Sequence, residues 1–337
     1  MTEMYSYVNA ASAVCSDGSK DVSSGLQKLI DENPNRVIFF PDGIYRLGEP
    51  VLTPADPTIS VSLLLSEFAV LKADEGWNSD EAMIRLGAGK PFNTIYINGS
   101  NYSISGGIID GSGVASAISV DSGRETSIHN ISIKHAKVGI HIKPGCNSNS
   151  SDTDVRDVNI VGNGTTGSVG LLVEGHDNTF TNMRIARVFT GVELRSSGNS
   201  LRNIHPLYTS DYTDYPNSCG FLDVKGNNWY SYAYSDQFGN GFRFGPDARG
   251  SILSDCFCYW YSPKGDYETM IKCDGKFKSV VRTPKVGFRS GPGIRSVLTV
   301  GDNGGCGYIE NLCLNSGHDE DLGDRTFREY LRGDVMF

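Results

Sequence analysis

One eight-residue template recurs through the middle of the chain and constrains its fold more than any other feature. The copies read TSIHNISI, TDVRDVNI, NTFTNMRI, NSLRNIHP and NNWYSYAY, beginning at residues 126, 153, 178, 199 and 227. Each copy has a polar first position, apolar third and sixth positions, and Asn, Asp or Ser at the fifth. A second short strand, opened by Gly139, Gly170, Gly191, Gly220 or Gly241, follows. Units this short cannot bury an apolar side alone, so successive copies must stack.

Stacking of these copies predicts a right-handed parallel β-helix, an all-β fold in which every coil contributes two or three short strands. Each strand then pairs in parallel with its equivalent one coil away, at a spacing of about 4.8 Å. The fifth positions of the template would share one bend, where their side chains satisfy backbone groups along the stack. They are Asn130, Asp157, Asn182, Asn203 and Ser231.

An amphipathic helix is predicted over residues 21–33, directly before the first coil. Leu26 and Ile30 have helical spacing, and Asp21 or Ser23 is the candidate N-cap. The helix is expected to cover the open N-terminal end of the stack, which would otherwise invite edge-to-edge association. The predicted domain is single, residues 1–337, and consists of the capping helix, the coils and a tail over the last coil: residues 21–33, 36–315 and 316–337.

Two motifs resemble those of the pectin-lyase-like superfamily. The predicted helix is followed by FPDGIY at residues 40–45, and GGIIDGSG follows at residues 106–113. Over roughly residues 8–315 the chain looks most similar to the branch of rhamnogalacturonase- and epimerase-type pectate lyase domains. The resemblance implies a β-helix that acts on a saccharide. The Asn-Thr-Asp, Asp-Asp, Gly-His-Gly and Arg-Ile-Lys motifs of polygalacturonases are absent, so the resemblance does not extend to that enzyme.

Charge and cysteine content exclude several classes of partner. The formal net charge of -9 argues against nucleic acid, because phosphate binding needs a clustered cationic surface. No apolar run could span a membrane, and the N-terminus lacks the pattern of a signal peptide. The eight cysteines show no C-x-x-C and no spacing typical of zinc, so no metal ligands are predicted. Free thiols favour a cytoplasmic location, and secretion after loss of a leader stays open.

Alternation of side chains along the strands assigns residues to three outward columns. The columns are His129, Arg156, Thr181, Arg202 and Tyr230; Ser132, Asn159, Arg184, His205 and Ala233; and His135, Gly162, Arg187, Tyr208 and Asp236. Their four arginines are interpreted as ligands for carboxylate or sulfate groups of a sugar chain, because the guanidinium fork suits planar anions. Arg243 in GFRF is a further candidate. Ion pairs with acidic residues on neighbouring coils are the alternative.

Two coils lengthen before their glycine-opened strand, and the second insertion, LYTSDYTDYPNSCG at residues 207–220, is rich in tyrosine and aspartate. Function concentrates on loops carried by a rigid scaffold. Tyr208 and Tyr212 are therefore candidate substrate-binding residues. In the next coil, Tyr230 falls on an outward column and is expected to face a ligand, whereas Trp229 aligns with core positions.

Glycosidic hydrolysis generally needs two carboxyl groups, held about 5 to 9.5 Å apart. Asp236 is the first candidate, and the second is Asp211, Asp214 or Glu193. His205, one coil from Asp236, is the candidate tuning partner or alternative base. The sequence thus favours cleavage of a poly- or oligosaccharide without a cofactor. Separately, the aspartate of GFLDV, Asp223, departs from the apolar pattern and marks either a bulge or a site.

Two other functions stay open. A β-eliminating lyase or uronate epimerase would use arginine, lysine, tyrosine or histidine as its base, and Ca²⁺ would be the cofactor of a lyase, although no dense Asp cluster falls on one column. A tailspike-like or purely carbohydrate-binding β-helix is the second alternative, because viral adhesins share the helix and FPDGIY opening. A monomer or a homotrimer with side-by-side packing is expected.

Overall fold

The computed structural model describes residues 7–88, 102–145, 150–209, 214–302 and 305–316. Short parallel strands wind into coils, and the chain is an all-β, right-handed parallel β-helix, as predicted. The coils form two compact units, Met1–Asn163 with Glu174–Thr179 (unit 1) and Gly164–Val173 with Phe180–Phe337 (unit 2). The single domain stays a prediction. Of the predicted tail, residues 316–337, only Ser316 is described, as the last residue of β31, and the rest lies outside the described residues. No helical segment within the described ranges has the length and apolar character needed to traverse a bilayer.

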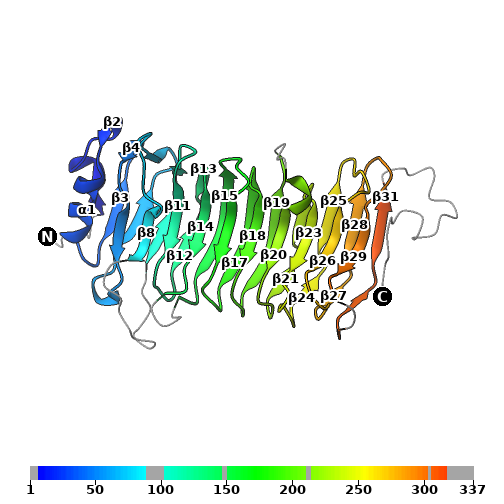
Figure 1. Ribbon diagram of the computed structural model, residues 1–337. Helices are drawn as coiled ribbons and strands as arrows, with labels where there is room; N and C mark the ends of the chain where they lie inside the picture. Colours follow the sequence, from blue (N-terminus) through cyan, green and yellow to red (C-terminus); the bar gives the residue numbers. More distant parts are fainter. Residues whose placement is uncertain (1–6, 89–101, 146–149, 210–213, 303–304, 317–337) are drawn as a thin grey trace. The chain divides into compact units, whose positions relative to one another are not determined.

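The coils of unit 1 contain a first, a second and a third strand (Figure 1). The first strands are β1 (Val8–Asn9), β3 (Val37–Phe40), β6 (Ser62–Leu65), β9 (Ser103–Ser105) and β12 (Ser127–His129). The second strands are β2 (Asp17–Asp21), β4 (Gly43–Leu47), β7 (Ala69–Ala73), β10 (Ile108–Asp110) and β13 (Ser132–Ala136). The third strands are β5 (Val51–Pro54), β8 (Ala82–Ala88), β11 (Ser116–Val120) and β14 (Val138–Ile142). β15 (Asp154–Gly162) pairs with both β12 and β13, and two 3-10 turns, η1 (Ala10–Ser12) and η2 (Pro57–Ile59), interrupt the connections.

The helix α1 (Ser23–Asp31) is shorter than the predicted 21–33 and covers the edge of the third strands. Its buried Leu26 and Ile30 face the coil interior. The side chain of Gln27 donates to the carbonyl of Leu52 at 3.1 Å and accepts from its N–H at 2.8 Å. Asp21 Oδ1 accepts from the backbone N–H of Ser23 at 2.9 Å. Because Gln27 satisfies the outer backbone groups of β5, the helix blocks the pairing of another strand there.

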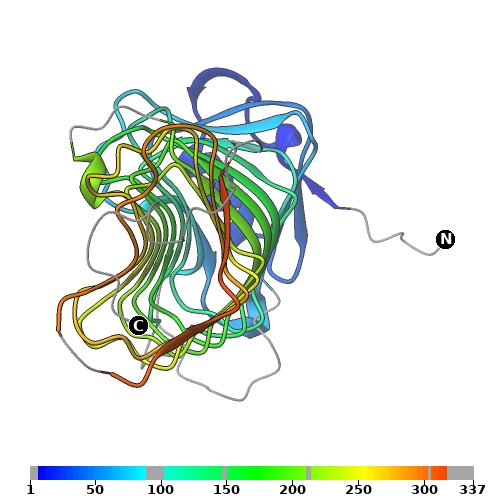
Figure 2. The ribbon, with the colours of Figure 1, turned by 90° about the vertical axis from the view of Figure 1, so that its right-hand side faces the viewer.

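The coils of unit 2 repeat the same order, and the strands of successive coils overlie one another when seen along the stack (Figure 2). β17 (Thr179–Ala186) and β19 (Ser200–Leu207) each span the first and second strand positions. The later first strands are β21 (Trp229–Ser231), β24 (Ile252–Ser254), β27 (Val280–Arg282) and β30 (Tyr308–Glu310). The later second strands are β22 (Tyr234–Asp236), β25 (Phe257–Trp260), β28 (Lys285–Phe288) and β31 (Cys313–Ser316). The third strands are β16 (Val169–Val173), β18 (Thr190–Leu194), β20 (Cys219–Asp223), β23 (Asn240–Phe244), β26 (Thr269–Cys273) and β29 (Ser296–Val300), and η4 (Tyr215–Asn217) precedes β20.

In every coil from β12 onward, a residue in the left-handed conformation bends the chain between the first and second strand positions. The bend residues are Asn130 and Asp157 in unit 1, and Asn182, Asn203, Tyr232, Asp255, Thr283 and Asn311 in unit 2, with φ between 45° and 56°. Asn203 Nδ2 donates to Asn182 Oδ1 at 3.1 Å, and Thr283 Oγ1 donates to Asp255 Oδ1 at 2.6 Å. Short polar side chains tolerate this conformation. The predicted bend is therefore confirmed for four of its five residues.

The fifth predicted bend residue, Ser231, is wrong by one position. Ser200 pairs with Trp229 and Leu201 pairs with Tyr230, so the whole coil is shifted by one residue from the template alignment. Because successive strand residues face opposite sides, the shift exchanges inside and outside. Tyr230 is buried and Trp229 is 49% exposed. The predictions of a ligand-facing Tyr230 and a core Trp229 are both incorrect.

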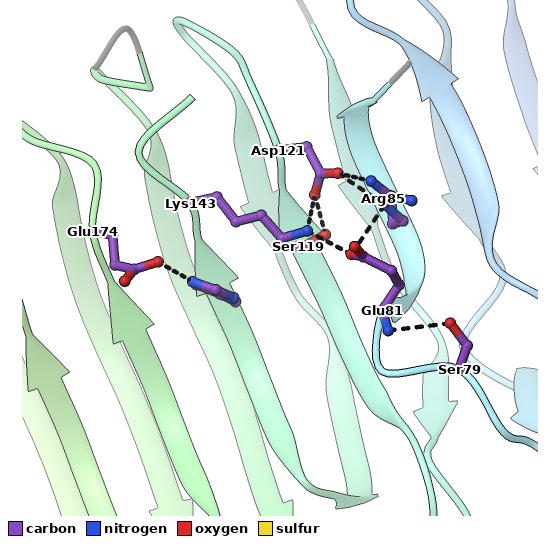
Figure 3. A network of polar contacts seen from close by, with 8 residues as sticks. Ser79, Glu81, Arg85, Ser119, Asp121, Lys143 and Glu174 are labelled. Atoms are coloured by element: carbon purple, nitrogen blue, oxygen red, sulfur yellow. Dashed lines mark hydrogen bonds and ion pairs between the residues drawn. The ribbon is translucent and has the colours of Figure 1, made fainter. Parts of the chain in front are cut away.

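A charged network lies on the outer side of the third strands of unit 1 (Figure 3). The carboxylate of Asp121 accepts hydrogen bonds from Arg85 Nε at 2.8 Å and from Ser119 Oγ at 2.5 Å. Lys143 Nζ lies 3.2 Å from Asp121 and 2.5 Å from Glu81. Each charge therefore has an opposite partner, which makes this network a structural feature rather than an open binding site.

Replacing Asp121 with asparagine is expected to destabilise the protein at pH 7 by about 1–3 kcal/mol. Burial alone would raise the pKa of Asp121, but hydrogen bonds from Ser119 and Arg85, together with the charge of Lys143, lower it. A lowered pKa stabilises the fold above the unfolded-state pKa and loses this effect as the pH falls through the folded-state pKa. The difference between wild type and variant in urea unfolding should thus shrink between pH 5 and about pH 3. A constant difference across that range would contradict this account.

Candidate functional site

A stacked row of side chains lines the outer side of the second strands in unit 2. This row, the ring ladder, consists of the residues two positions after the bend in four successive coils: His205, Tyr234, Phe257 and Lys285. The rings of His205 and Tyr234 stack with centroids 4.1 Å apart, and those of Tyr234 and Phe257 with centroids 4.7 Å apart. Lys285 Nζ lies 5.3 Å from the centroid of Phe257 in a cation–π contact. The stacking fixes the position of each ring.

Asp236 lies beside the ring ladder, on the same side of β22 as Tyr234. Its side chain is only 14% exposed. Oδ2 accepts a hydrogen bond from the Tyr234 hydroxyl at 3.1 Å and lies 3.5 Å from His205 Nε2. Burial, and then the charge of Asp236, raise the pKa of Tyr234. Tyr234 therefore stays a neutral hydroxyl donor at physiological pH and holds the carboxylate in place.

Two polar atoms of this cluster lack a hydrogen-bond partner within the described part of the chain. They are Asp236 Oδ1 and His205 Nε2, both buried from solvent. The 3.5 Å contact between His205 and Asp236 is close enough for charge attraction, but it does not meet the geometry of a hydrogen bond. Buried polar atoms nearly always have a partner. These two unsatisfied atoms therefore make the cluster the candidate functional site of unit 2.

The insertion after β19 begins directly beside Asp236. The backbone N–H of Tyr208 donates to the carbonyl of Asp236 at 2.9 Å. The ring of Tyr208 packs against Tyr215 and Phe238, with centroids 5.0 and 5.5 Å away. Burial is also the main cause of the raised pKa of Tyr215. An aromatic cluster therefore anchors the start and end of this loop, and a backbone hydrogen bond joins its start to Asp236.

The three candidates for the second carboxyl group lie in different parts of the structure. Asp211, together with the predicted sugar ligand Tyr212, lies outside the described residues. Asp214 is exposed, and its carboxylate accepts a hydrogen bond from the side chain of Asn217 at 2.7 Å. Glu193 lies on β18, a third strand, where it pairs with Arg195 at 2.6 Å. The placement of Glu193 beside Asp236 is therefore wrong, because the two residues belong to different sheets.

The arginines predicted to bind a sugar chain fall into two groups, those in an ion pair and those without one among the described residues. In unit 1, Arg156 is exposed and forms an ion pair with Asp154, which is the structural alternative. In unit 2, Arg243 lies on the outer side of the third strands and pairs with Asp274 at 2.9 Å. Three exposed arginines of unit 2 have no ion pair within the described residues: Arg184, Arg187 and Arg202. These three stay candidates for binding an anionic group.

Asp223 marks neither a bulge nor a site, because it is the centre of a buried polar network. Its carboxylate accepts from the Tyr230 hydroxyl at 3.0 Å and the Ser251 hydroxyl at 2.7 Å. It also accepts from Asn228 Nδ2 at 3.1 Å and the backbone N–H of Gly226 at 2.7 Å. The network joins neighbouring coils inside unit 2, so its role is structural.

The described cysteines are free thiols, and four of them, all in unit 2, are buried. Burial raises the pKa of Cys219, Cys256 and Cys273 to about 12, so they are inert thiols in the core. No group of three or more His, Cys, Asp or Glu side chains able to hold a metal ion occurs within the described ranges.

Comparison with known proteins finds structural similarity but no relative by sequence. No protein-family model and no curated protein matches the chain. A tailspike protein mutant of E. coli bacteriophage HK620 in complex with a pentasaccharide is 10% identical, with a TM-score of 0.65, and the alignment covers 93% of this chain and 67% of that one. Another mutant of that tailspike, in complex with a hexasaccharide, is 12% identical with a TM-score of 0.59 over the same shares. PfbA, a surface adhesin of Streptococcus pneumoniae, is 13% identical over 92% and 91% of the chains, with a TM-score of 0.50. At these identities the similarity shows one thing about this chain, namely its fold: a right-handed parallel β-helix.

Proposed function

We propose that unit 2 binds a poly- or oligosaccharide across the outer side of its second strands and cleaves a glycosidic bond at Asp236. The observation that carries the proposal is the pair of buried, unpartnered atoms Asp236 Oδ1 and His205 Nε2 beside the ring ladder. Sugar hydroxyls both donate and accept hydrogen bonds, so they can supply both missing partners. The tailspike proteins described in complex with a pentasaccharide and a hexasaccharide add support, because they carry saccharides on the same fold.

Asp236 is assigned the proton-transfer role. Its 3.5 Å distance from His205 is shorter than the roughly 5 to 9.5 Å that separate two groups flanking a glycosidic bond. His205 is therefore a tuning partner of Asp236, and the second carboxyl group comes from the adjacent insertion, from Asp211 or Asp214. In hydrolysis, an acid protonates the glycosidic oxygen as the C–O bond breaks. Water adds to the anomeric carbon, and its proton passes to the base.

β-Elimination is the second candidate reaction. Arg184 occupies the position two residues after the bend, as His205 does one coil later, and it is exposed without an ion pair among the described residues. A guanidinium in that place could hold the carboxylate of a uronate while His205 removes the C5 proton. The C4–C5 double bond then forms as the C4–O bond breaks, and the leaving oxygen takes a proton from water. Tyr234 is a poor base for this step because its pKa is raised.

Incubation with a panel of neutral and uronate-containing oligosaccharides tests the proposal. New reducing ends without an unsaturated product identify a hydrolase, whereas absorbance of an unsaturated uronate identifies a lyase. Binding without any product identifies a binding protein and contradicts the catalytic part of the proposal. A wild-type protein that binds no saccharide of the panel contradicts all of it.

The variant Arg184→Ala is expected to weaken binding of uronate-containing glycans about tenfold and to leave neutral glycans unaffected. A charge-assisted hydrogen bond contributes about 1.5–3 kcal/mol, and about 1.4 kcal/mol corresponds to a factor of ten in Kd. Calorimetric titration at low and high salt measures the effect, because salt should weaken the same interaction. Arg156→Ala, which removes an ion-paired arginine, is the matched control. Equal losses for both classes of glycan would assign Arg184 a structural role.

A further inference from the structure

Two large aromatic side chains of unit 2 project into solvent at the beginning of one coil. Trp229 is 49% exposed and Tyr232 is 57% exposed. Between them in the chain lies Ser231, which pairs with Arg202 in one neighbouring coil and with Ser254 in the other. The two rings therefore border a strip of small or charged polar side chains. This surface lies on the first strands and the bend at Tyr232, whereas Asp236 and the ring ladder lie on the second strands.

The backbone at Tyr232 is in a conformation that its side chain does not favour. Tyr232 has a φ of 53° and is one of the bend residues, which elsewhere are Asn, Asp or Thr. Bulky side chains rarely adopt this left-handed conformation, whereas Asn and Asp tolerate it well. Folding alone would thus favour asparagine at position 232. Strained residues of this kind gather at functional sites, where another requirement outweighs the cost.

Trp229 also begins a row of outward apolar side chains that follows the stack. Through direct strand pairing it is followed by Ile252, Val280 and Tyr308, one residue per coil. Strand neighbours are about 4.8 Å apart, so the row offers regularly spaced apolar contacts along the coil axis. Ile252 and Val280 are half-buried and only the two terminal rings are strongly exposed.

We infer that Trp229 and Tyr232 form a second saccharide-binding subsite, on the first strand β21 and the bend that follows it, whereas Asp236 lies on the second strand; the inference rests on the proposed saccharide-binding function. A pyranose ring has an apolar C–H face bordered by hydroxyl groups, and an aromatic face next to polar groups matches it. Arg202, exposed without an ion pair within the described residues, supplies donors beside Ser231, and Asp255, exposed at the next bend, supplies acceptors. A protein partner would need a larger exposed apolar surface, because Ile252 and Val280 in the row are half-buried and Ser231 separates Trp229 from Tyr232.

Two substitutions test the subsite, with the panel oligosaccharide that the wild type binds most tightly as the probe. Trp229→Ala should lower affinity at least tenfold, and saccharide binding to the wild type should change the Trp229 fluorescence. Tyr232→Asn should also lower affinity at least tenfold and at the same time raise the thermal midpoint, because asparagine suits the left-handed bend. A merely structural role of Tyr232 would lower the midpoint instead. Tyr261→Ala, which removes another exposed tyrosine, is the control and should bind as the wild type does.

The outcomes separate this inference from the proposed function. If Asp236→Asn impairs the reaction while Trp229→Ala and Tyr232→Asn keep full affinity, the subsite is refuted and the proposed function stands. If Trp229→Ala changes the molecular mass in light scattering but not the saccharide affinity, the surface is a protein interface and the subsite is again refuted. A wild type that binds nothing in the panel refutes both proposals.

Discussion

Replacing Asp236 with asparagine is expected to lower the turnover of a cleaved glycan by about 10²–10⁴-fold, the range typical of positioned acid–base groups. The amide keeps the size of the side chain and can still accept the hydrogen bond from Tyr234, so the fold should be intact. It cannot transfer a proton as the carboxyl does. Initial rates from reducing-end or absorbance assays, with circular dichroism spectra and thermal midpoints measured alongside, provide the test.

The matched control is Asp274→Asn, which alters a half-buried carboxylate paired with a cation in the other sheet of unit 2. It should keep wild-type turnover. His205→Gln should lower turnover less than Asp236→Asn and should shift the pH profile, because His205 acts through Asp236. Turnover of Asp236→Asn within a factor of two of the wild type would remove Asp236 from the reaction.

Replacing Asp223 with alanine should cost about 3 kcal/mol or more of folding free energy, since each unsatisfied buried polar group costs about 1–3 kcal/mol. The side-chain amide of Asn228 keeps the carbonyls of Ser196 and Gly226 as acceptors. The substitution leaves three other donors without their acceptor: the hydroxyls of Tyr230 and Ser251 and the N–H of Gly226. All three are buried, so water cannot replace the carboxylate without opening the core. Urea unfolding followed by Trp fluorescence and far-UV circular dichroism measures the loss.

Asp274→Ala is the control for this measurement. Its ion pair with Arg243 is partly exposed, and pairs of that kind contribute about 0–1 kcal/mol. A loss for Asp223→Ala no larger than for Asp274→Ala would mean that the buried network does not stabilise the coils. Saccharide binding provides a separate readout, because Asp223 faces inward and its removal should act on stability first.

The repeat was sufficient to predict the fold and most of the coil phase. A polar side chain at a fixed place in each copy indicated a bend, and Asn130, Asp157, Asn182 and Asn203 all adopt the left-handed conformation that such residues tolerate. The contact between His205 and Asp236 followed from the same reasoning. Residues that are one coil apart in the sequence become direct neighbours in the stack. The repeat length therefore predicts which residues lie close together.

The predicted strand register was wrong in the coil that contains β21, because Trp229 and Tyr230 both suit an inward or an outward position. The template chose Trp229 as the core residue by its apolar character. The downstream coils contained the corrective signal: Asp255, Thr283 and Asn311 continue the bend column, and counting back from them places the bend at Tyr232. The register of this coil was missed because its bend residue is Tyr232, whereas the predicted bend residues of the preceding coils are Asn or Asp.

The outward columns did not predict which sheet each candidate carboxylate lies on. Glu193 and Asp236 both lie on outward positions, but the first is on a third strand and the second on a second strand. The template covered only the first and second strands. The unpartnered atoms of Asp236 and His205 were also beyond sequence reasoning, since hydrogen-bond satisfaction depends on side-chain geometry within about 0.5 Å.

The bend residues have a consequence for how such a scaffold can diversify. The bend residue fixes the strand register of its coil. The segments that join second to third strands can therefore change length without shifting the strands of neighbouring coils. Residues 208–218, 237–239 and 261–268 already make this junction with very different lengths in three successive coils. Exchanging the first of these segments would change the chain that follows Leu207, the residue paired with Asp236, and leave the strands in register. New ligand preferences can therefore be grafted onto this chain by loop exchange, with the core sequence unchanged.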